Sequence, residues 1–338
     1  MKIAQLCSVY RSVNSHSPFG VHHFIGNLAD SLAQQHDVTV FAAGDSVTRA
    51  KLQSVTETNA AFRNASDTEI MRENLETASL CYRQAKKFDI IHDHFMLVGC
   101  HFSPLVSTPT VHSIHMPVTA ELRKHLLQYK KEKFISFSHA QRKQFPELNW
   151  VANIYHGIDT NIYTFQETSD EYVLYLGRIT EDKGVHHAIA AAKAANVQIL
   201  IAGISNSDEG YWRKEIEPHI DGNQVRFIGH ANLEQKVFLM QNAKALLFPT
   251  LAEETFGLVM IEAMSCGTPV IAFDRGAIQE VIQDKETGFI VNTEKQMVAA
   301  IKKVDTLSRF AARKRVETFF SIERMTRGYE RVYQRYVK

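Results

Sequence analysis

Short apolar runs alternate with longer helical patterns along the whole chain, and this order constrains the fold more than any other feature. A strand followed by a helix and another strand forms a right-handed crossover, so the repeated order predicts parallel sheets covered by helices on both faces. We therefore expect each half of the chain to form a Rossmann-like domain of about six strands. The expected strands are Ile3–Val9, Val38–Ala42, Ile90–Ile91, Thr110–Ile114, Phe134–Phe137, Val151–Tyr155, Tyr172–Leu176, Gln198–Ala202, Val225–Ile228, Ala245–Phe248, Val270–Phe273 and Phe289–Val291.

The length of 338 residues suits two domains of roughly 150 residues each. Residues 156–170 are polar and rich in turn-forming residues, so the linker is expected there. We expect an N-terminal domain over residues 1–160, a C-terminal domain over 161–315, and a helix over 316–338 that braces the two. The apolar face of that last helix comprises Ile322, Met325, Tyr329, Val332 and Tyr333.

Charge and composition exclude several classes of protein. A formal net charge of +1 gives no overall field that would attract nucleic acid or a membrane, so no nucleic-acid partner is expected. The four cysteines are scattered, which is typical of buried thiols in a reducing compartment. Residues 1–10 predict a strand and not a signal peptide, and no apolar run approaches the ~18 residues of a membrane span. We expect a soluble, cytoplasmic protein.

Residues 253–270 carry the strongest functional signal. A buried strand ends just before them, and Phe256 and Gly257 open an apolar helix whose free N–H groups and positive dipole end would attract an anion. Glu254 precedes this helix start and Glu262 lies within the helix, so their carboxylates can hold hydroxyl groups on either side of the anion. A phosphate flanked by two sugars is what a nucleotide sugar offers. The segment therefore predicts a donor site.

Glu262 could instead be an ordinary acid on the surface of a helix. Its neighbours Ile261, Ala263 and Met264 argue against this alternative, because they indicate a helix that is buried on nearly all sides. An unpaired acid in such a helix would be costly, so Glu262 is expected to have a partner or a function.

A second anion signal lies over residues 176–184, at the junction of a strand and a helix. Arg178 and Lys183 follow the carboxyl end of the strand, where open α/β sheets bind ligands, and both can bind phosphate oxygens. The alternative is that they are solvated surface cations paired with Glu181 and Asp182.

Several motifs are missing from the sequence, and their absence favours phosphate binding without a metal. There is no G-x-G-x-x-G and no P-loop, which argues against a dinucleotide oxidoreductase and a P-loop NTPase. There is also no D-x-D triplet to hold a divalent cation on a diphosphate. Arg178, Lys183 and the helix start at Phe256–Leu258 would then neutralise the leaving diphosphate, each charge-assisted hydrogen bond contributing roughly 1.5–3 kcal/mol.

Taken together, these motifs resemble the retaining glycosyltransferases of family GT4, which have the GT-B fold of two Rossmann-like domains facing a central cleft. The E-x7-E element formed by Glu254 and Glu262 is the most specific match. Residues 88–94, 156–159, 177–184 and 287–291 support it.

The resemblance also implies a role for each residue of the donor site. Glu254 would contact hydroxyls of the transferred sugar, and Glu262 would hold the ribose. The segment Thr255, Phe256, Gly257 and Leu258 would bind the distal phosphate through its backbone, while Arg178 and Lys183 would bind the diphosphate.

The family pattern places a catalytic histidine at His115, directly after the strand Thr110–Ile114. It would hydrogen-bond the donor sugar and help to carry developing positive charge through its backbone carbonyl; the alternative is a purely structural histidine. His92 and His94 form an H-x-H triplet that could bind zinc, but no third ligand suggests itself, and we favour His94 as a residue that lines the cleft.

One position departs from the family, which has a Gly-Gly pair in the loop after the first strand. Phe19 replaces the first glycine here, while Gly20 can still allow a close approach of the backbone to the donor. Phe19 either alters the local geometry or gives an aromatic platform to the acceptor.

Residues 122–133 form a basic amphipathic stretch, for which a solvated helix face is favoured over peripheral membrane contact.

The sequence thus predicts a retaining, metal-independent hexosyltransferase without a cofactor. The donor would be a nucleotide sugar, with a UDP-sugar favoured and GDP-mannose possible, and the acceptor a hydroxyl on a small molecule, a glycan or a lipid-linked acceptor. Retention without an evident nucleophile suggests attack on the same face, with the leaving phosphate as the base. The alternatives are a nucleotide-sugar epimerase, a phosphorylase, or a nucleotide-sugar-binding protein without transfer activity.

Overall fold

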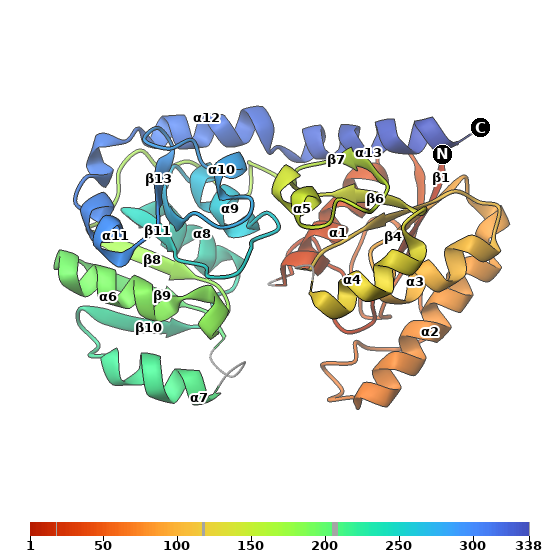
Figure 1. Cartoon of the computed structure of the whole chain (residues 1–338), viewed down its shortest axis with the longest axis horizontal. Coiled ribbons are helices and arrows are strands. Elements are labelled where there is room, and N and C mark those ends of the chain that lie inside the picture. The colour runs from red at the N-terminus through yellow and green to blue at the C-terminus, as the bar shows by residue number, and fades with distance from the viewer. Residues whose placement is uncertain (18, 117–118, 205–208, 338) are drawn as a thin grey trace. The chain divides into compact units, whose positions relative to one another are not determined.

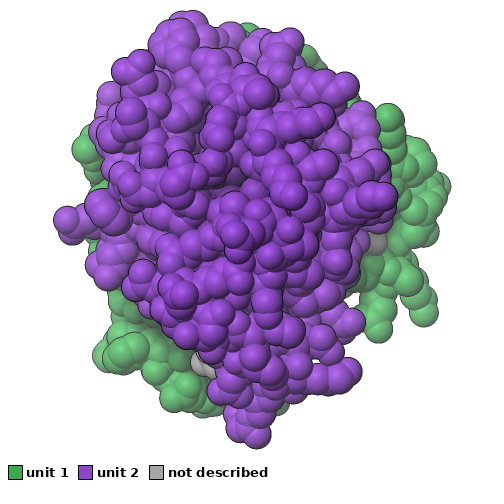
Figure 2. Space-filling view, turned by 90° about the vertical axis from the view of Figure 1, so that its left-hand side faces the viewer, with its two compact units in different colours: residues 1–157, 322–338 green, residues 158–321 purple. Residues whose placement is uncertain are grey.

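The computed structural model describes residues 1–17, 19–116, 119–204 and 209–337. The chain forms two compact units, which Figure 2 distinguishes by colour. Unit 1 comprises Met1–Gly157 and Ile322–Lys338, and unit 2 comprises Ile158–Ser321. Each unit has a parallel sheet with helices around it (Figure 1), so the predicted pair of Rossmann-like domains is confirmed.

In its described residues, unit 1 has a seven-stranded sheet of order β3-β2-β1-β4-β5-β6-β7. Every neighbouring pair is parallel. Strand β3 was not expected, because it is a three-residue strand at the sheet edge with no buried residue. The strands are β1 (Lys2–Leu6), β2 (Asp37–Phe41), β3 (Lys51–Gln53), β4 (Ile90–Asp93), β5 (Thr110–Ser113), β6 (Lys133–Ser136) and β7 (Trp150–Asn153).

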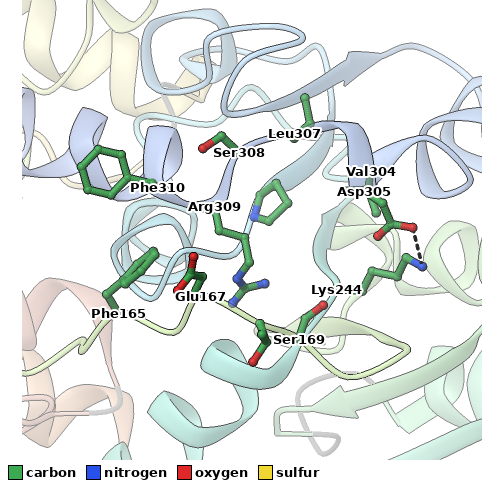
Figure 3. Close-up of a pocket in the computed structure, with 12 residues that line it drawn as sticks. Phe165, Glu167, Ser169, Lys244, Val304, Asp305, Leu307, Ser308, Arg309 and Phe310 are labelled. Carbon is green, nitrogen blue, oxygen red and sulfur yellow. Dashed lines mark ion pairs between the residues drawn. The ribbon is translucent and has the colours of Figure 1, made fainter.

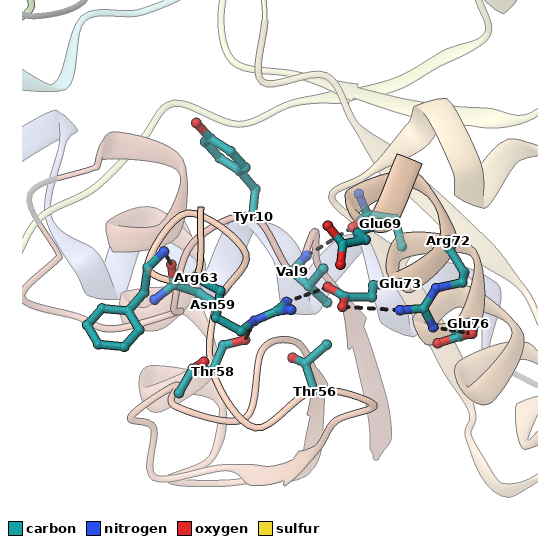
Figure 4. Close-up of polar contacts among 12 residues, drawn as sticks. Val9, Tyr10, Thr56, Thr58, Asn59, Arg63, Glu69, Arg72, Glu73 and Glu76 are labelled. Atoms are coloured by element: carbon teal, nitrogen blue, oxygen red, sulfur yellow. Dashed lines mark hydrogen bonds and ion pairs between the residues drawn. The ribbon is translucent and has the colours of Figure 1, made fainter. Parts of the chain in front are cut away.

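The helices of unit 1 pack their apolar faces on this sheet. The start of α2 is fixed by a capping box between Ser66 and Glu69. The preceding loop is held on the same helix by Arg63, which donates to Glu73 at 2.6 Å (Figure 4). The helices are α1 (Gly20–Leu32), α2 (Asp67–Arg83), α3 (Met96–Phe102), α4 (Ala120–Leu126), α5 (His139–Gln144) and α13 (Ile322–Tyr336).

The end of the chain contains two helices where one was predicted over residues 316–338. Helix α12 (Arg309–Phe319) belongs to unit 2, and α13 begins after a break at residues 320–321 and belongs to unit 1. The predicted apolar face of α13 is buried, apart from Ile322, which is partly exposed. Polar contacts add to this packing, since Glu330 binds His36 at 2.9 Å and Thr326 binds Ser31 at 2.9 Å. A role in bracing the two units stays a prediction.

The sheet of unit 2 has six strands in its described residues, all parallel, in the order β10-β9-β8-β11-β12-β13. The order reverses between β8 and β11, and such a switch point is where open α/β sheets bind ligands. The strands are β8 (Tyr172–Leu176), β9 (Gln198–Ala202), β10 (Val225–Gly229), β11 (Ala245–Phe248), β12 (Val270–Phe273) and β13 (Gly288–Val291). The helices are α6 (Val185–Ala195), α7 (Glu209–Tyr211), α8 (Leu233–Asn242), α9 (Leu258–Ser265), α10 (Ile278–Val281), α11 (Glu294–Ile301) and α12.

None of the helices in the described ranges combines the length and the apolar composition that crossing a bilayer requires.

A buried ion pair lies in the sheet of unit 1. His112 on β5 and Asp93 on β4 are fully buried, and Nδ1 of the histidine lies 2.6 Å from Oδ2 of the aspartate. Burial lowers the pKa of His112, but Cys100 and Asp93 outweigh this effect and raise it well above its ordinary value. The three side chains could be taken for a metal site. The 2.6 Å contact leaves no room for an ion between two ligands, so we interpret the group as an imidazolium–carboxylate pair.

This interpretation predicts the effect of removing the carboxylate. The Asp93→Asn variant should lose about 3–5 kcal/mol of the free energy of unfolding, because the buried imidazolium would lose its close counter-ion and keep only Glu132, 3.6 Å away. Urea denaturation would measure the loss. Glu76→Gln is the matched control: it breaks the exposed pair with Arg72 (2.8 Å) in the same unit and should cost less than about 1 kcal/mol. Equal losses in the two variants would contradict the buried ion pair.

Candidate functional site

The loops that follow β8 and β11 lie against each other at the carboxyl edge of the unit 2 sheet. The backbone N–H of Leu251 donates to the carbonyl of Asp182 at 2.8 Å. At Gly184, which has a φ of +67°, a Cβ atom would lie 2.1 Å from the carbonyl oxygen of Pro249. Only glycine therefore permits this approach, which brings residues 177–184 beside the start of the E-x7-E element.

Lys183 and Glu254 meet across these two loops. The lysine Nζ lies 2.8 Å from Oε2 of the glutamate, and the two side chains are 21% and 14% exposed. The structure thus brings together the cation predicted for the diphosphate and the acid predicted for the sugar. Arg178 lies elsewhere on the loop: its side chain is 61% exposed and lies 3.6 Å from Asp182. The surface pairing considered as an alternative thus applies to Arg178, while Lys183 pairs with Glu254.

The loop after β12 holds Glu254 in place. The N–H of Ala277 donates to the carbonyl of Glu254 at 2.9 Å, and the N–H of Gly276 donates to the carboxylate of Glu253 at 2.8 Å. Gly276 has a φ of +60°, and a Cβ atom there would lie 2.2 Å from the carbonyl oxygen of Glu254. Three strand-end loops therefore determine the position of one carboxylate.

Helix α9 begins directly after Gly257, which has a φ of +88°. No side chain caps the helix, and no acid lies in its first turn, so its N-terminal N–H groups are open to an anion. The ring of Phe256 is fully buried and packs edge-on against Phe320, with the ring centroids 5.6 Å apart. This packing anchors the segment from Thr255 to Leu258 while its backbone forms the helix start.

Glu262 is buried within α9, as the apolar neighbours indicated. The hydroxyl of Tyr163 donates to Oε1 at 2.9 Å, and Nζ of Lys236 on α8 lies 2.5 Å from Oε2. The pKa of Tyr163 is raised by burial and by the charge of Glu262. Both partners were missed in the sequence, because each lies in another element and no short motif connects it to Glu262.

The other two predicted site residues, Gly20 and His115, belong to unit 1. Gly20 is the first residue of α1, and the preceding Phe19 adopts an extended conformation with a φ of −99°. This position therefore does not require glycine, and the helix starts normally, with His23 donating to the carbonyl of Phe19 at 2.9 Å. The Arg11 guanidinium covers the Phe19 ring, 4.2 Å from its centroid.

His115 follows β5 and is partly exposed. Its Nε2 lies 3.0 Å from Nδ1 of His94, which is buried. Burial, followed by the nearby His22, lowers the pKa of His115 to about 3, so its ring is neutral near pH 7. His92 lies between Tyr333 and Ser113, at 2.6 and 2.8 Å, so both of its ring nitrogens have hydrogen-bond partners.

A hollow of about 670 Å³ lies elsewhere in unit 2 and contains none of the predicted site residues (Figure 3). It is lined by Lys244 and Pro269, which directly precede β11 and β12, so it lies at the amino edge of the sheet. Lys244 pairs with Asp305 at 2.9 Å, and Arg309 donates to the carbonyls of Gln166 and Ala243, both at 2.8 Å. These charged groups are already paired, so the carboxyl edge remains the better candidate site.

The close contact between Gly276 and the Glu254 backbone can be tested by mutation. Gly276→Ala should lower the free energy of unfolding, because the new methyl group would overlap the Glu254 backbone. Gly222→Ala is the control, since Gly222 also has a positive φ (+72°) but nothing lies within 4 Å of its Cβ position. The control should lose roughly 1–2 kcal/mol from backbone strain alone. Gly276→Ala should lose about 1–3 kcal/mol more in chemical denaturation, and equal losses would exclude the close contact.

Comparison with known proteins identifies the families that match this chain. The family described as Glycosyl transferases group 1 matches residues 162–316, and the one described as Glycosyltransferase Family 4 matches residues 19–183. The phosphatidyl-myo-inositol mannosyltransferase of Mycolicibacterium smegmatis is 30% identical over 241 residues, which are 62% of this chain and 61% of the relative. That of Mycobacterium leprae is 34% identical over 125 residues, covering 35% and 32%. The matches thus span less than two thirds of either relative.

Solved structures share the fold over nearly the whole chain. Sucrose-phosphate synthase from Thermosynechococcus elongatus superposes with a TM-score of 0.79 at 21% identity, covering 99% of this chain and 98% of that one. The Anabaena protein HepE, in complex with UDP-glucose, gives a TM-score of 0.76 at 19% identity, covering 99% and 100%. The two units thus form the GT-B fold that was predicted, and with both family matches over residues 19–316 the chain belongs to glycosyltransferase family 4.

Proposed function

We propose that this protein transfers a hexose from a nucleotide sugar to an acceptor hydroxyl, with retention at the anomeric carbon and without a metal. The observation that best supports this proposal is the Lys183–Glu254 pair, which lies on the same edge of the sheet as the open N-terminus of α9. A cation, a carboxylate and free N–H groups are what the diphosphate and the sugar hydroxyls of such a donor require.

In the proposed complex, the donor replaces the contact between Lys183 and Glu254. The diphosphate would bind Lys183 and the N–H groups of Gly257 and Leu258, because both attract negative charge. Glu254 would then accept hydrogen bonds from hydroxyls of the transferred sugar. Arg178 has an exposed side chain and would add a second cation to the diphosphate. These positive groups would stabilise the leaving diphosphate, so no metal is assigned to that role.

Glu262 would bind the ribose of the nucleotide. Its two oxygens accept from Tyr163 and Lys236, which fix the orientation of the carboxylate. A UDP-sugar is the favoured donor, in keeping with the UDP-glucose bound to HepE, and GDP-mannose is the second donor to test.

The proposed reaction proceeds by attack on the same face of the sugar. The acceptor oxygen bonds to the anomeric carbon as the bond from that carbon to the phosphate oxygen breaks, and the proton of the acceptor hydroxyl moves to the leaving phosphate. His115 would contact the donor sugar as a neutral ring and so would not add a positive charge to an oxocarbenium-like transition state. Small molecules, glycans and lipid-linked acceptors are the classes to test, the last because two relatives are named phosphatidyl-myo-inositol mannosyltransferase.

Replacing one carboxyl group tests the proposal. Glu254→Gln should lower the rate of sugar transfer by about 10²–10³-fold, because a preorganised charged hydrogen-bond acceptor at the sugar is lost. UDP binding, measured by calorimetry, should change little, because the diphosphate and ribose contacts remain. Initial rates with UDP-glucose and an acceptor panel would measure the first effect.

Glu253→Gln is the matched control, since this neighbouring acid holds Gly276 and is assigned no contact with the donor. Its transfer rate should remain close to that of the native protein. Full activity of Glu254→Gln would remove Glu254 from the mechanism. Conversion of the donor without any acceptor would instead identify an epimerase, and UDP binding without turnover over the whole donor and acceptor panel would identify a binding protein.

A further inference from the structure

A chain of hydrogen-bonded polar groups runs through unit 1 and ends at His115. It starts at Gln5 on β1, which is fully buried, and its Oε1 lies 2.7 Å from Nε2 of His94. His94 follows β4, and its Nδ1 lies 3.0 Å from Nε2 of His115, which follows β5. Strands β1, β4 and β5 are consecutive in the sheet, so the three side chains belong to three neighbouring strand positions.

The chemistry of these contacts fixes where each proton lies. The amide oxygen of Gln5 can only accept, so Nε2 of His94 must carry the proton that it donates. The pKa of His94 is lowered well below its ordinary value by burial and by His92, His115 and His156, so its ring is neutral. Its Nδ1 therefore has a lone pair and accepts from His115, whose Nε2 must carry a proton. The lone pair of His115 is then on Nδ1.

The Gln5 amide is oriented with Oε1 towards His94, and its buried nitrogen has no hydrogen-bond partner in the described part of the chain. The order of protons depends on this orientation, which the tautomers of His94 and His115 report.

We propose that Gln5 and His94 are positioning residues, which hold His115 in the tautomer with a protonated Nε2 and so leave Nδ1 as the acceptor for a hydroxyl of the transferred sugar. This inference rests on the proposed function in assigning the sugar, but the tautomer itself does not depend on it. Gln5 and His94 act through His115 and do not contact the substrate.

The tautomer affects the reaction because positive charge develops on the sugar. A lone pair directed at the sugar is favourable to that charge, whereas an N–H group directed at it is unfavourable. Aromatic packing limits the rotation of the His115 ring, since the Phe24 and Phe137 rings lie 5.1 and 4.7 Å from its centroid. Packing sets the plane of the ring, and the hydrogen-bonded chain sets which nitrogen carries the proton.

The tautomers can be observed directly in the full-length protein labelled with ¹⁵N-histidine, because protonated and unprotonated ring nitrogens have well-separated NMR shifts. In the native protein, His94 and His115 should both be protonated at Nε2. Gln5→Met keeps the size of the side chain but removes the acceptor, so a second tautomer should appear at both histidines.

Ser113→Ala is the matched control, because it removes a buried hydrogen bond of His92 that is not part of the chain to His115. It should alter the signals of His92 alone. In transfer assays, Gln5→Met should lower kcat by about 10- to 100-fold with little change in the KM for the donor, and Ser113→Ala should stay close to the native rate.

A native His115 protonated at Nδ1 would overturn the inference, and this measurement requires no variant to fold. A Gln5→Met variant with unchanged tautomers and unchanged kcat would also overturn it. If the tautomers respond as expected but the native protein transfers no sugar, the proposed function fails while the positioning of His115 by Gln5 and His94 stands.

Discussion

The candidate site of unit 2 depends on the contact between the loop after β8 and the loop after β11. These strands are neighbours only because the strand order reverses between them, and the loops can touch only because Gly184 has no side chain. Their contact places Lys183 within 2.8 Å of Glu254. Without this loop contact, Lys183 would be an ordinary surface lysine, and Glu254 would lack its ion-pair partner. The fold thus determines the chemistry through two backbone segments that are far apart in the sequence.

The Lys183–Glu254 pair also prepares the site electrostatically. Each side chain is largely shielded from solvent, so leaving either charge unpaired would be costly. The pairing holds both groups in place at the edge where α9 begins. In the proposed complex, the diphosphate would take over the contact of Lys183, and the sugar hydroxyls that of Glu254. Glu262 is prepared in the same way by Lys236 and Tyr163.

The sequence was informative where burial creates a periodic pattern. Most strands of unit 2 were predicted within a residue or two, and the burial of Glu262 followed from its apolar neighbours. Strand β3 was missed, because a three-residue edge strand has no such pattern. The partners of Glu262 were missed for another reason: Tyr163 is 99 residues away in the sequence, and only the fold brings them together. The break between α12 and α13 was also missed; Phe320, which lies in this break, packs against Phe256.

The histidines of unit 1 show why the function of a side chain cannot be assigned from its type alone. His92, His94 and His115 lie in or directly after strands β4 and β5. The sequence suggested a metal site for the first two and a catalytic role for the third. His92 is saturated by Tyr333 and Ser113, and His94 connects Gln5 to His115. His115 alone of the three is partly exposed, with Nδ1 as its remaining acceptor. The hydrogen-bond partners of each histidine therefore decide its role. His92 is part of the packed interior, His94 connects Gln5 to His115, and His115 is the candidate contact for the sugar.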